Sequence, residues 1–389
     1  MRDEMKKVPR LRFRGFSEDW ELCKLGEVFD FKQGVQVPVE EQFTTLEEGM
    51  QRFIRIVDLT TDEEPPRYIK YDSDNLVSES DLFMVRYGAV GVIGLGYEGV
   101  IANNLFKLIP RIVVDEKFSY HQLIKNKDKI ISLSSSTTMP ALSFKTLKNL
   151  SFSVSSVDEQ KQIGSFFANL DNLITLHQRK LDQLKELKKA YLQLMFPKKD
   201  ETVPRVRFAD FEDDWQLCKL GETFSIIMGQ SPNSENYTEN PDDYILVQGN
   251  SDMKNNKVVP RIWTTQVTKK AEKGDLILSV RAPVGEIGKT DYNVVLGRGV
   301  AAVKGNDFIF QQLRKMKDSG YWTRYSTGST FESINSNDIK EALINIPNKD
   351  EQQKIGDLFT HLDDAIILNQ NKLNQLKSLK KSYLQNMFI

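Results

Sequence analysis

Apolar residues recur every three or four positions along two long stretches of the chain, residues 158–196 and 350–388. No proline interrupts either stretch. An apolar rhythm near 3.5 residues, held over this length, is typical of helices whose apolar seam packs in a coiled coil. At 1.5 Å per residue, each predicted helix is about 55 Å long.

The two predicted seams carry similar residues at matching positions. In the first helix the seam contains Ile163, Phe167, Leu170, Ile174, His177, Leu181, Leu184, Lys188, Tyr191 and Met195. In the second helix it contains Ile355, Phe359, Leu362, Ile366, Asn369, Leu373, Leu376, Lys380, Tyr383 and Met387. Polar residues interrupt both seams at the same two places. Buried polar seam positions cost stability and restrict the register in which helices pair.

Both predicted helices begin with capping-box spacing, Ser156 with Glu159 and Asn348 with Glu351, and Pro197 ends the first. Matching seams in one chain are natural partners, so we expect an intramolecular helix pair. The alternative is that each helix packs on its own globular half. Parallel and antiparallel pairing are both possible, and a two-fold relation between the copies favours the antiparallel one.

A second repeat precedes each helix by more than a hundred residues. Residues 8–29 read VPRLRFRGFSEDWELCKLGEVF, and residues 203–224 read VPRVRFADFEDDWQLCKLGETF. This match implies a duplication, so the whole chain is interpreted as two copies of one unit. The regions that follow, about residues 30–155 and 225–347, differ between the copies. Their short β-rich runs, glycine turns and occasional helices predict an α+β domain in each half.

A faint common frame persists in the variable regions. The run DLFMVR at 81–86 resembles DLILSVR at 275–281, and glycine-rich turns follow both. This alignment treats Arg86 and Arg281 as equivalent. Residues 134–138 likewise align with the STGST loop at 326–330. Each of these loops is followed by a short predicted helix and then by a predicted strand, at Leu150–Val154 and Ala342–Ile346.

The predicted fold is therefore α+β, with two globular domains joined by two long antiparallel coiled-coil helices in a pseudo-two-fold internal repeat. We expect a first domain over 1–157, its helix over 158–196, and a polar linker over 197–204. The second domain is expected over 205–349 and its helix over 350–389. The linker is bounded by prolines, as connecting segments often are.

Composition adds few constraints. The 53 basic and 54 acidic residues give a net charge of −1, so overall charge does not indicate nucleic acid and any such surface must arise from local clustering. The chain has no signal peptide and no apolar run long enough to cross a bilayer, so a cytoplasmic location is expected. Cys23 and Cys218 occupy equivalent repeat positions and are interpreted as reduced packing residues.

Catalytic motifs are not apparent in the sequence. The three histidines are dispersed, and there is no P-loop, GxGxxG or GxSxG pattern. Residues 240–244, NPDDY, faintly resemble a motif of amino-methyltransferases but lack its second proline and are interpreted as a turn. We therefore expect no catalytic residue, metal site or cofactor in this chain and interpret it as a binding protein.

Two dissimilar domains held by rigid helices suit the reading of two DNA half-sites at a fixed separation. Arginine can pair with guanine and Asn or Gln with adenine, while Lys, Ser and Thr more often contact phosphate. The candidate contacts are Arg86, Asn103, Asn104, Lys107, Ser136 and Thr137 in the first region and Gln248, Asn250, Arg261, Arg281, Arg298, Arg324, Ser326, Thr327 and Ser329 in the second. The alternative for each is a surface side chain without a DNA contact.

These motifs, in this order and given twice, resemble the specificity (S) subunits of type I restriction–modification systems. The residues that carry the resemblance are 20–27 and 215–222, the two DL…R runs, the loop at 326–330, and the helix starts at 159–163 and 351–355. Residues 134–138 depart from the pattern because they lack its glycine.

The resemblance implies that each variable region is a target recognition domain that reads one part of a split, asymmetric double-stranded DNA site. The helices would set the gap and dock two modification subunits, which use S-adenosylmethionine to methylate adenine N6. Restriction subunits would add ATP- and Mg-dependent translocation and cleavage. This chain itself would be non-catalytic. Two other classes stay open: a coiled-coil scaffold that binds only proteins, and a self-sufficient methyltransferase.

Overall fold

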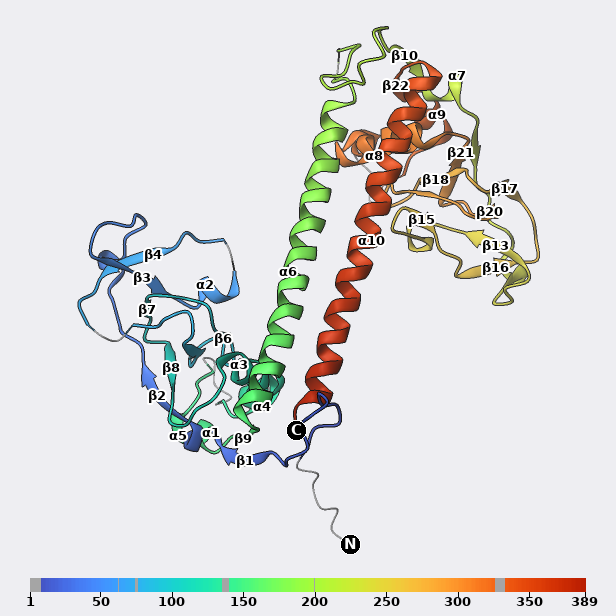
Figure 1. Ribbon diagram of the computed structural model, residues 1–389. Coiled ribbons are helices and arrows are strands. Elements are labelled where there is room, and N and C mark those ends of the chain that lie inside the picture. The colour runs from blue at the N-terminus through green and yellow to red at the C-terminus, as the bar shows by residue number, and fades with distance from the viewer. Residues whose placement is uncertain (1–7, 62, 74–75, 135–139, 199, 326–332) are drawn as a thin grey trace. The chain divides into compact units, whose positions relative to one another are not determined.

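The computed structural model describes residues 8–61, 63–73, 76–134, 140–198, 200–325 and 333–389. It forms two compact units, and each is described by itself (Figure 1). The first contains the chain up to Leu176 together with Leu373–Ile389, and the second contains His177–Lys372. Each unit therefore combines one globular domain with part of each long helix, α6 (Val157–Leu194) and α10 (Lys349–Met387).

The first unit contains two small sheets and a strand pair. Its sheet orders are β2-β8-β5-β6, β4-β3-β7 and β1-β9. The strands are β1 (Glu21–Lys24), β2 (Phe29–Gln33), β3 (Met50–Ile54), β4 (Arg67–Lys70), β5 (Leu82–Val85), β6 (Ile93–Gly94), β7 (Val100–Ile101), β8 (Leu105–Pro110) and β9 (Ser151–Val154). The helices are α1 (Leu25–Val28), η1 (Val39–Glu41), α2 (Val57–Thr60), α3 (Glu116–Lys125), α4 (Lys127–Ser132) and α5 (Phe144–Lys148).

The second unit follows the same plan with larger sheets. The sheet orders are β11-β21-β18-β19-β15-β14, β12-β16-β13-β20-β17 and β10-β22. The strands are β10 (Gln216–Lys219), β11 (Ile226–Met228), β12 (Tyr237–Thr238), β13 (Tyr244–Val247), β14 (Met253–Lys254), β15 (Lys257–Val258), β16 (Ile262–Thr264), β17 (Lys269–Ala271), β18 (Leu276–Ser279), β19 (Ile287–Lys289), β20 (Val294–Leu296), β21 (Val300–Val303) and β22 (Leu343–Ile346). The helices are α7 (Leu220–Thr223), η2 (Ser234–Asn236), η3 (Asn250–Asp252), α8 (Asp307–Asp318), η4 (Tyr321–Tyr325) and α9 (Ser336–Lys340).

The long helices run antiparallel within the first unit. The ring of Phe167 on α6 lies 5.6 Å from that of Phe388, just past the end of α10. One turn further along α6, Asp171 forms an ion pair with Lys380 at 2.5 Å. The contact partners have lower numbers on α10 as the residue number on α6 increases. The two helices are therefore antiparallel, as predicted.

The second unit repeats this pairing with the other parts of the two helices. His177 contacts Asn369 at 3.3 Å, and Lys188 forms an ion pair with Asp363 at 2.5 Å. The polar seam residues therefore meet polar partners across the helix pair. The structure buries most of the predicted apolar seam, including Ile163, Phe167, Leu170, Leu181, Met195, Ile355, Phe359, Leu362, Leu373, Leu376 and Met387.

The predicted helix caps hold only in part. The backbone N–H of Glu351 donates to Asn348 Oδ1 at 2.9 Å, as expected for a cap. The prediction that the glutamates reach back to close a capping box is wrong, because the carboxylates of Glu159 and Glu351 accept bonds from arginines elsewhere in the fold. Both glutamates are fully buried, and a buried carboxylate needs a positive partner.

Those arginines belong to the repeated segments 8–29 and 203–224. Arg12 donates two hydrogen bonds to Glu159, at 2.6 and 2.8 Å, and Trp20 Nε1 donates a third at 3.1 Å. Arg207 binds Glu351 in the same way, at 2.7 and 2.8 Å. Such two-point, charge-assisted contacts fix both distance and orientation. The repeated segments therefore anchor each domain to the start of its long helix.

A glycine in each long helix lets a domain helix approach closely. A Cβ atom on Gly164 would lie 2.4 Å from Asp115 Oδ1 and 2.8 Å from the backbone nitrogen of Phe118, at the start of α3. A Cβ on Gly356 would lie 3.1 Å from the backbone nitrogen of Phe308 in α8. The absence of a side chain at these positions explains why the helix-start motif includes glycine in both copies.

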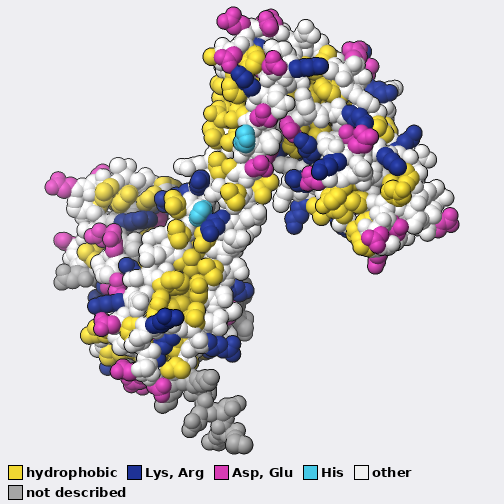
Figure 2. Space-filling view, turned by 45° about the vertical axis from the view of Figure 1, so that its right-hand side comes forward, with side chains coloured by type: hydrophobic (Ala, Val, Ile, Leu, Met, Phe, Trp, Pro, Cys, Tyr) yellow, Lys and Arg dark blue, Asp and Glu magenta, His cyan; other side chains and the backbone are white. Residues whose placement is uncertain are grey.

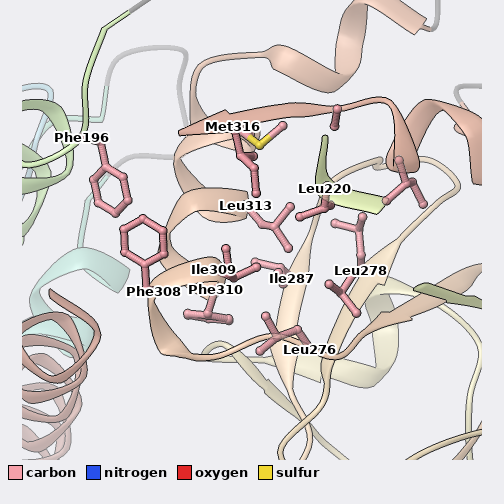
Figure 3. Packing of buried hydrophobic residues seen from close by; sticks show 14 of the residues in the cluster. Phe196, Leu220, Leu276, Leu278, Ile287, Phe308, Ile309, Phe310, Leu313 and Met316 are labelled. Atoms are coloured by element: carbon pink, nitrogen blue, oxygen red, sulfur yellow. The ribbon is translucent and has the colours of Figure 1, made fainter. Parts of the chain in front are cut away.

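The core of the second unit packs between α8 and its six-stranded sheet. Figure 3 shows Ile309 and Leu313 of α8 directed toward Leu276, Leu278 and Ile287 of the sheet, while Phe308 points toward Phe196. Phe196, just past the end of α6, stacks on Phe308 with ring centroids 5.3 Å apart. Burial of such side chains stabilises a fold by about 1.5–3 kcal/mol each. The globular domain and the long helix thus share one core. Over the described residues, no helix is both long and apolar enough to span a membrane.

Candidate nucleic-acid interface

Three predicted DNA contacts of the second half, separated in sequence, meet at one hollow. Gln248 follows β13, Asn250 begins η3 and Arg281 lies just past β18, and all three line this hollow together with Ser251 and Gly299. The ends of β13 and β18 therefore bring an amide pair and a guanidinium to one small surface. These are the side chains that can pair with adenine and guanine edges.

The hollow is held in shape by local hydrogen bonds. The Gln248 side chain donates to the Tyr237 hydroxyl at 2.8 Å, and the Gln248 backbone N–H donates to the Asp252 carboxylate at 2.8 Å. Arg261 donates to the Ser251 carbonyl at 3.0 Å and lies 3.6 Å from Asp252. Arg261 therefore supports the η3 turn, and about half of its side chain is exposed. Side chains fixed in this way are pre-organised for recognition.

Arginines border this hollow with exposed side chains. Arg281 is exposed, while its backbone pairs with Ser333. Arg298 is also exposed, in the turn between β20 and β21, and its backbone N–H donates to Ser231 Oγ at 3.1 Å. Its neighbour Gly299 lines the hollow. Both arginines are thus held by their backbones with guanidinium groups on the surface.

Arg86 of the first half is placed differently from the exposed arginines. Its guanidinium donates to the Leu142 carbonyl at 3.0 Å and to Gln33 Oε1 at 2.7 Å. It also lies 4.2 Å from the centre of the Phe144 ring, a cation–π contact. Arg86 is half-buried and joins three parts of its domain, and its role in DNA contact stays a prediction.

The alignment of Arg86 with Arg281 is wrong. The Arg86 backbone N–H donates to the Asn104 carbonyl, as that of Val280 donates to Gly299. The Arg86 carbonyl accepts from Leu142 N–H, as that of Val280 accepts from Ile334 N–H.

By these bonds Arg86 corresponds to Val280, and Tyr87 corresponds to Arg281. The second run has one more residue before its arginine than the first. Matching the two arginines therefore shifted the alignment by one residue. Tyr87 pairs through its backbone with Ala141, as Arg281 pairs with Ser333. The exposed arginine of one half is therefore replaced by a tyrosine in the other.

Lys107 also has internal partners. Its ammonium donates to Asp81 at 2.7 Å and to the Leu76 carbonyl at 3.1 Å. Burial would raise the pKa of Asp81, but hydrogen bonds from Lys107 and Ser78 outweigh it, so this pKa lies below its ordinary value. A lysine held in this way stabilises the start of β5.

The two predicted asparagine contacts lie in the turn before β8. Asn103 is exposed, and its side chain donates to Gln36 Oε1 at 3.4 Å. Asn104 is half-buried, and its Oδ1 has no hydrogen-bond partner in the described part of the chain. Counted along the matching strands, Asn103 corresponds to Arg298 and Asn104 to Gly299. This turn therefore lies at the same place in both domains.

Five of the remaining candidates lie outside the described residues, namely Ser136, Thr137, Ser326, Thr327 and Ser329. Arg324 belongs to η4, but its side chain is outside the described part.

Sequence reasoning missed two residues of these surfaces, Tyr237 and Tyr87. Tyr237 reaches Gln248 only because β12 and β13 both pair with β16. No local pattern predicts that pairing. Tyr87 follows Arg86 directly, and an ungapped alignment from Asp81 and Asp275 would have identified it.

Charges of both signs are mixed on the surface. On the face seen in Figure 2, Lys and Arg side chains lie among Asp and Glu side chains on both units. Within the described residues, no group of three or more His, Cys, Asp or Glu side chains is arranged to hold a metal ion.

The same architecture is characteristic of one family. The model of the type I restriction modification DNA specificity domain matches residues 17–186 and again residues 212–378. The chain belongs to the type I restriction modification DNA specificity family. Each match covers one recognition domain with most of the long helix that follows it.

Relatives of this specificity family are similar over different lengths. A putative MjaX specificity subunit of Methanocaldococcus jannaschii is 28% identical over 249 residues, which span 61% of this chain and 58% of that protein. The MjaVIII specificity subunit of the same organism is 21% identical over 393 residues, 94% of this chain and 91% of that protein.

Solved structures show the same fold. The S subunit of the type I system of M. genitalium matches with a TM-score of 0.70 at 16% identity, over 98% of this chain and 99% of that one. A chain from a study of type I complex assembly and conformational transition matches with a TM-score of 0.53 at 20% identity, over 95% of this chain and 97% of that one. The predicted family, the predicted α+β fold and the role as a specificity subunit with two target recognition domains are confirmed.

Proposed function

We propose that each target recognition domain of this specificity subunit reads one part of a split, asymmetric double-stranded DNA site. The observation that carries the proposal is the duplication itself: both halves match the specificity domain, yet their variable regions differ. Two equivalent surfaces with different side chains suit two different short sequences.

The second domain reads bases through the hollow of Gln248, Asn250 and Arg281. Arg281 contacts a guanine in the major groove, where its planar fork matches O6 and N7. Gln248 or Asn250 contacts an adenine, whose N6 and N7 present a donor and an acceptor. Arg298 and the nearby backbone N–H groups bind phosphate and set the register. Support comes from the convergence of these residues at one hollow.

The first domain uses the corresponding turns with other side chains. Asn103 corresponds to Arg298, and Tyr87 corresponds to Arg281. Arg86 and Lys107 have strong internal partners, so they support this surface from within more than they extend from it. The difference between Tyr87 and Arg281 is one basis on which the halves read different bases.

The long helices set the gap between the half-sites and dock two modification subunits. Their sequence is repeated far better than that of the domains, which fits two copies of one partner. Catalysis belongs to those partners: modification subunits bind S-adenosylmethionine and methylate adenine N6. Restriction subunits with ATP and Mg join the full complex in the cytoplasm. The similarity to the putative MjaX and the MjaVIII specificity subunits of restriction enzymes supports this division.

A salt series tests DNA binding. The chain, assembled with modification subunits, is titrated with duplex DNA containing its site between about 50 and 200 mM salt. Phosphate contacts release counterions, so the logarithm of affinity should fall steeply and linearly with the logarithm of salt concentration. A flat response, with assembly intact, would instead favour a scaffold that binds only proteins. S-adenosylmethionine binding by the isolated chain would favour a self-sufficient methyltransferase.

A further inference from the structure

A large hollow in the second unit is lined by α6, α8, α10 and the turn between β14 and β15, and it shares no lining residue with the hollow of Gln248, Asn250 and Arg281. Its volume is about 660 Å³, enough for several side chains. Leu192 of α6 and Ile366 and Ile367 of α10 contribute apolar walls. Most of its surface is apolar, so water fills it poorly and an apolar group would be stabilised there.

Positive charge surrounds these apolar walls. The lining includes five Lys or Arg side chains but only two carboxylates, Asp318 and Asp363. Asp363 is already bound by Lys188 at 2.5 Å. Lys185 and Lys189, one turn apart on α6, are exposed at the hollow. The hollow therefore has an excess of positive charge.

Two lysines of the hollow are affected by burial. Burial and the neighbouring Arg314 lower the pKa of Lys188 to about 8. Burial likewise lowers the pKa of Lys315 to about 8, although its ammonium donates to the Pro197 carbonyl at 3.1 Å. Both shifts arise mainly from burial, which penalises the charged ammonium. A carboxylate arriving beside Lys188 would favour its charged form.

The lysines of the hollow recur in the other long helix. The run LKELKKAY at 184–191 carries Lys185, Lys188 and Lys189, and LKSLKKSY at 376–383 carries lysine at the same three places. In the first unit Lys380 binds Asp171 at 2.5 Å, as Lys188 binds Asp363. The recognition domains diverged, but this cationic pattern did not. A partner that meets both copies in the same way accounts for that difference.

We propose that this hollow receives an acidic segment of the modification subunit, with an apolar side chain inserted between Leu192 and Ile367 and flanking carboxylates bound by Lys185 and Lys189. This inference rests on the proposed function, since it assigns a chemistry to the docking of that subunit. The apolar walls favour a protein segment over DNA, because a phosphate backbone would leave them unfilled. The lysines repeated in α10 would offer the same positive charges to a second copy of the segment.

The test measures assembly of the full-length chain with the modification subunit of its system. The double variant Lys185→Glu/Lys189→Glu reverses two exposed charges and should raise the dissociation constant at least tenfold. Ile367→Trp, which places a bulky ring in the hollow, should do the same while keeping the thermal midpoint of the wild type. The matched control, Lys180→Glu, changes an exposed lysine of α6 outside the hollow and should alter the constant less than twofold.

The outcomes separate the two proposals. If the wild type assembles and both variants assemble equally well, the hollow is not a docking site and only this inference is overturned. If assembly is unchanged but the DNA affinity of the charge-reversal complex falls, the lysines bind phosphate, and the inference is again overturned. If the wild type itself does not assemble with the modification subunit, both this inference and the proposed docking role are overturned.

Discussion

The ammonium group of Lys188 lies 2.5 Å from each carboxylate oxygen of Asp363, across the antiparallel helix pair of the second unit. Gln311 of α8 also donates to Asp363, at 3.2 Å, so the carboxylate joins both long helices to the recognition domain. In the first unit Asp171 has the same position, bound by Lys380 and by His121 of α3. Each unit thus fixes helix register and domain orientation through one aspartate.

The Lys188–Asp363 pair should show energetic coupling in a double-mutant cycle. Lys188→Met and Asp363→Asn, singly and together, are expected to give a coupling of about 1–3 kcal/mol, because contacts within one network are not additive. Asp363→Asn alone should be the more damaging, since it leaves a buried ammonium without its counter-charge. Urea unfolding provides the free energies, with Lys180→Met as an exposed control. Additive effects of the two changes would show that the pair does not hold the helices.

The contribution of Lys188 to the free energy of unfolding should rise with pH. Its pKa is about 8 in the folded chain, against an ordinary value of 10.5. Between these values the unfolded chain binds more protons at this residue, so raising the pH favours the folded state. From about pH 7.5 to pH 10 the wild type should gain about 2.4 kcal/mol relative to Lys188→Met. A constant difference between the two unfolding curves would contradict the lowered pKa.

Gly164→Ala should destabilise the first unit. The added Cβ would lie 2.4 Å from Asp115 Oδ1, so α3 must shift away from α6. We expect a loss of about 1–3 kcal/mol, typical of overpacking, despite the better helix propensity of alanine. Thermal or urea unfolding measures it. Ser165→Ala, at the next and exposed position, serves as control and should change stability by less than about 0.5 kcal/mol. Equal effects of both substitutions would show that close approach at Gly164 is unimportant.

Arg281→Ala should weaken specific DNA binding and relax one base position of the second half-site. Loss of a bidentate guanine contact costs about 1–3 kcal/mol of discrimination. Binding to a library of sites with that half randomised measures the change. Lys254→Ala, an exposed change in the same domain, should leave the sequence profile intact. An unaltered profile for Arg281→Ala would remove this arginine from the base-reading residues.

The gap between half-sites should follow helix length. Matched insertion of one heptad in both α6 and α10 keeps antiparallel partners in register and adds about 10 Å. That length corresponds to about three base pairs at 3.4 Å each. The preferred gap, read from methylated sites, should increase accordingly, whereas a heptad in α6 alone should disrupt pairing. If the matched insertion leaves the gap unchanged, the helices do not set it.

The long helices could be predicted from sequence because their pattern is local. The seam, the starts near Asp158 and Asp350, and the short strands before them depend on residues close in the chain, and the structure begins α6 at Val157 and α10 at Lys349. Antiparallel pairing also followed, since duplicated seams usually relate by a two-fold axis. The hydrogen bonds from Arg12 to Glu159 were not predicted, because the two residues lie far apart in the sequence.

The candidate DNA surfaces were predicted less well. Residue type alone identified Gln248, Asn250 and Arg281, but their meeting point depends on sheet pairings that no local pattern reveals. Composition could not tell the exposed Arg281 from the internally bound Arg86, because both follow β-rich runs. Only the hydrogen bonds around Asn104 and Gly299 show that Tyr87 occupies the place of Arg281.

The central claim, that two dissimilar domains each read one part of a split site, is tested most directly by sequencing methylated adenines in a host that carries the system. The wild type should give one bipartite, asymmetric motif with a fixed gap. Replacing residues 225–347 with the corresponding region of another specificity subunit should change one half of that motif and leave the other half and the gap unchanged. A continuous motif, or a replacement that alters both halves, would contradict the account.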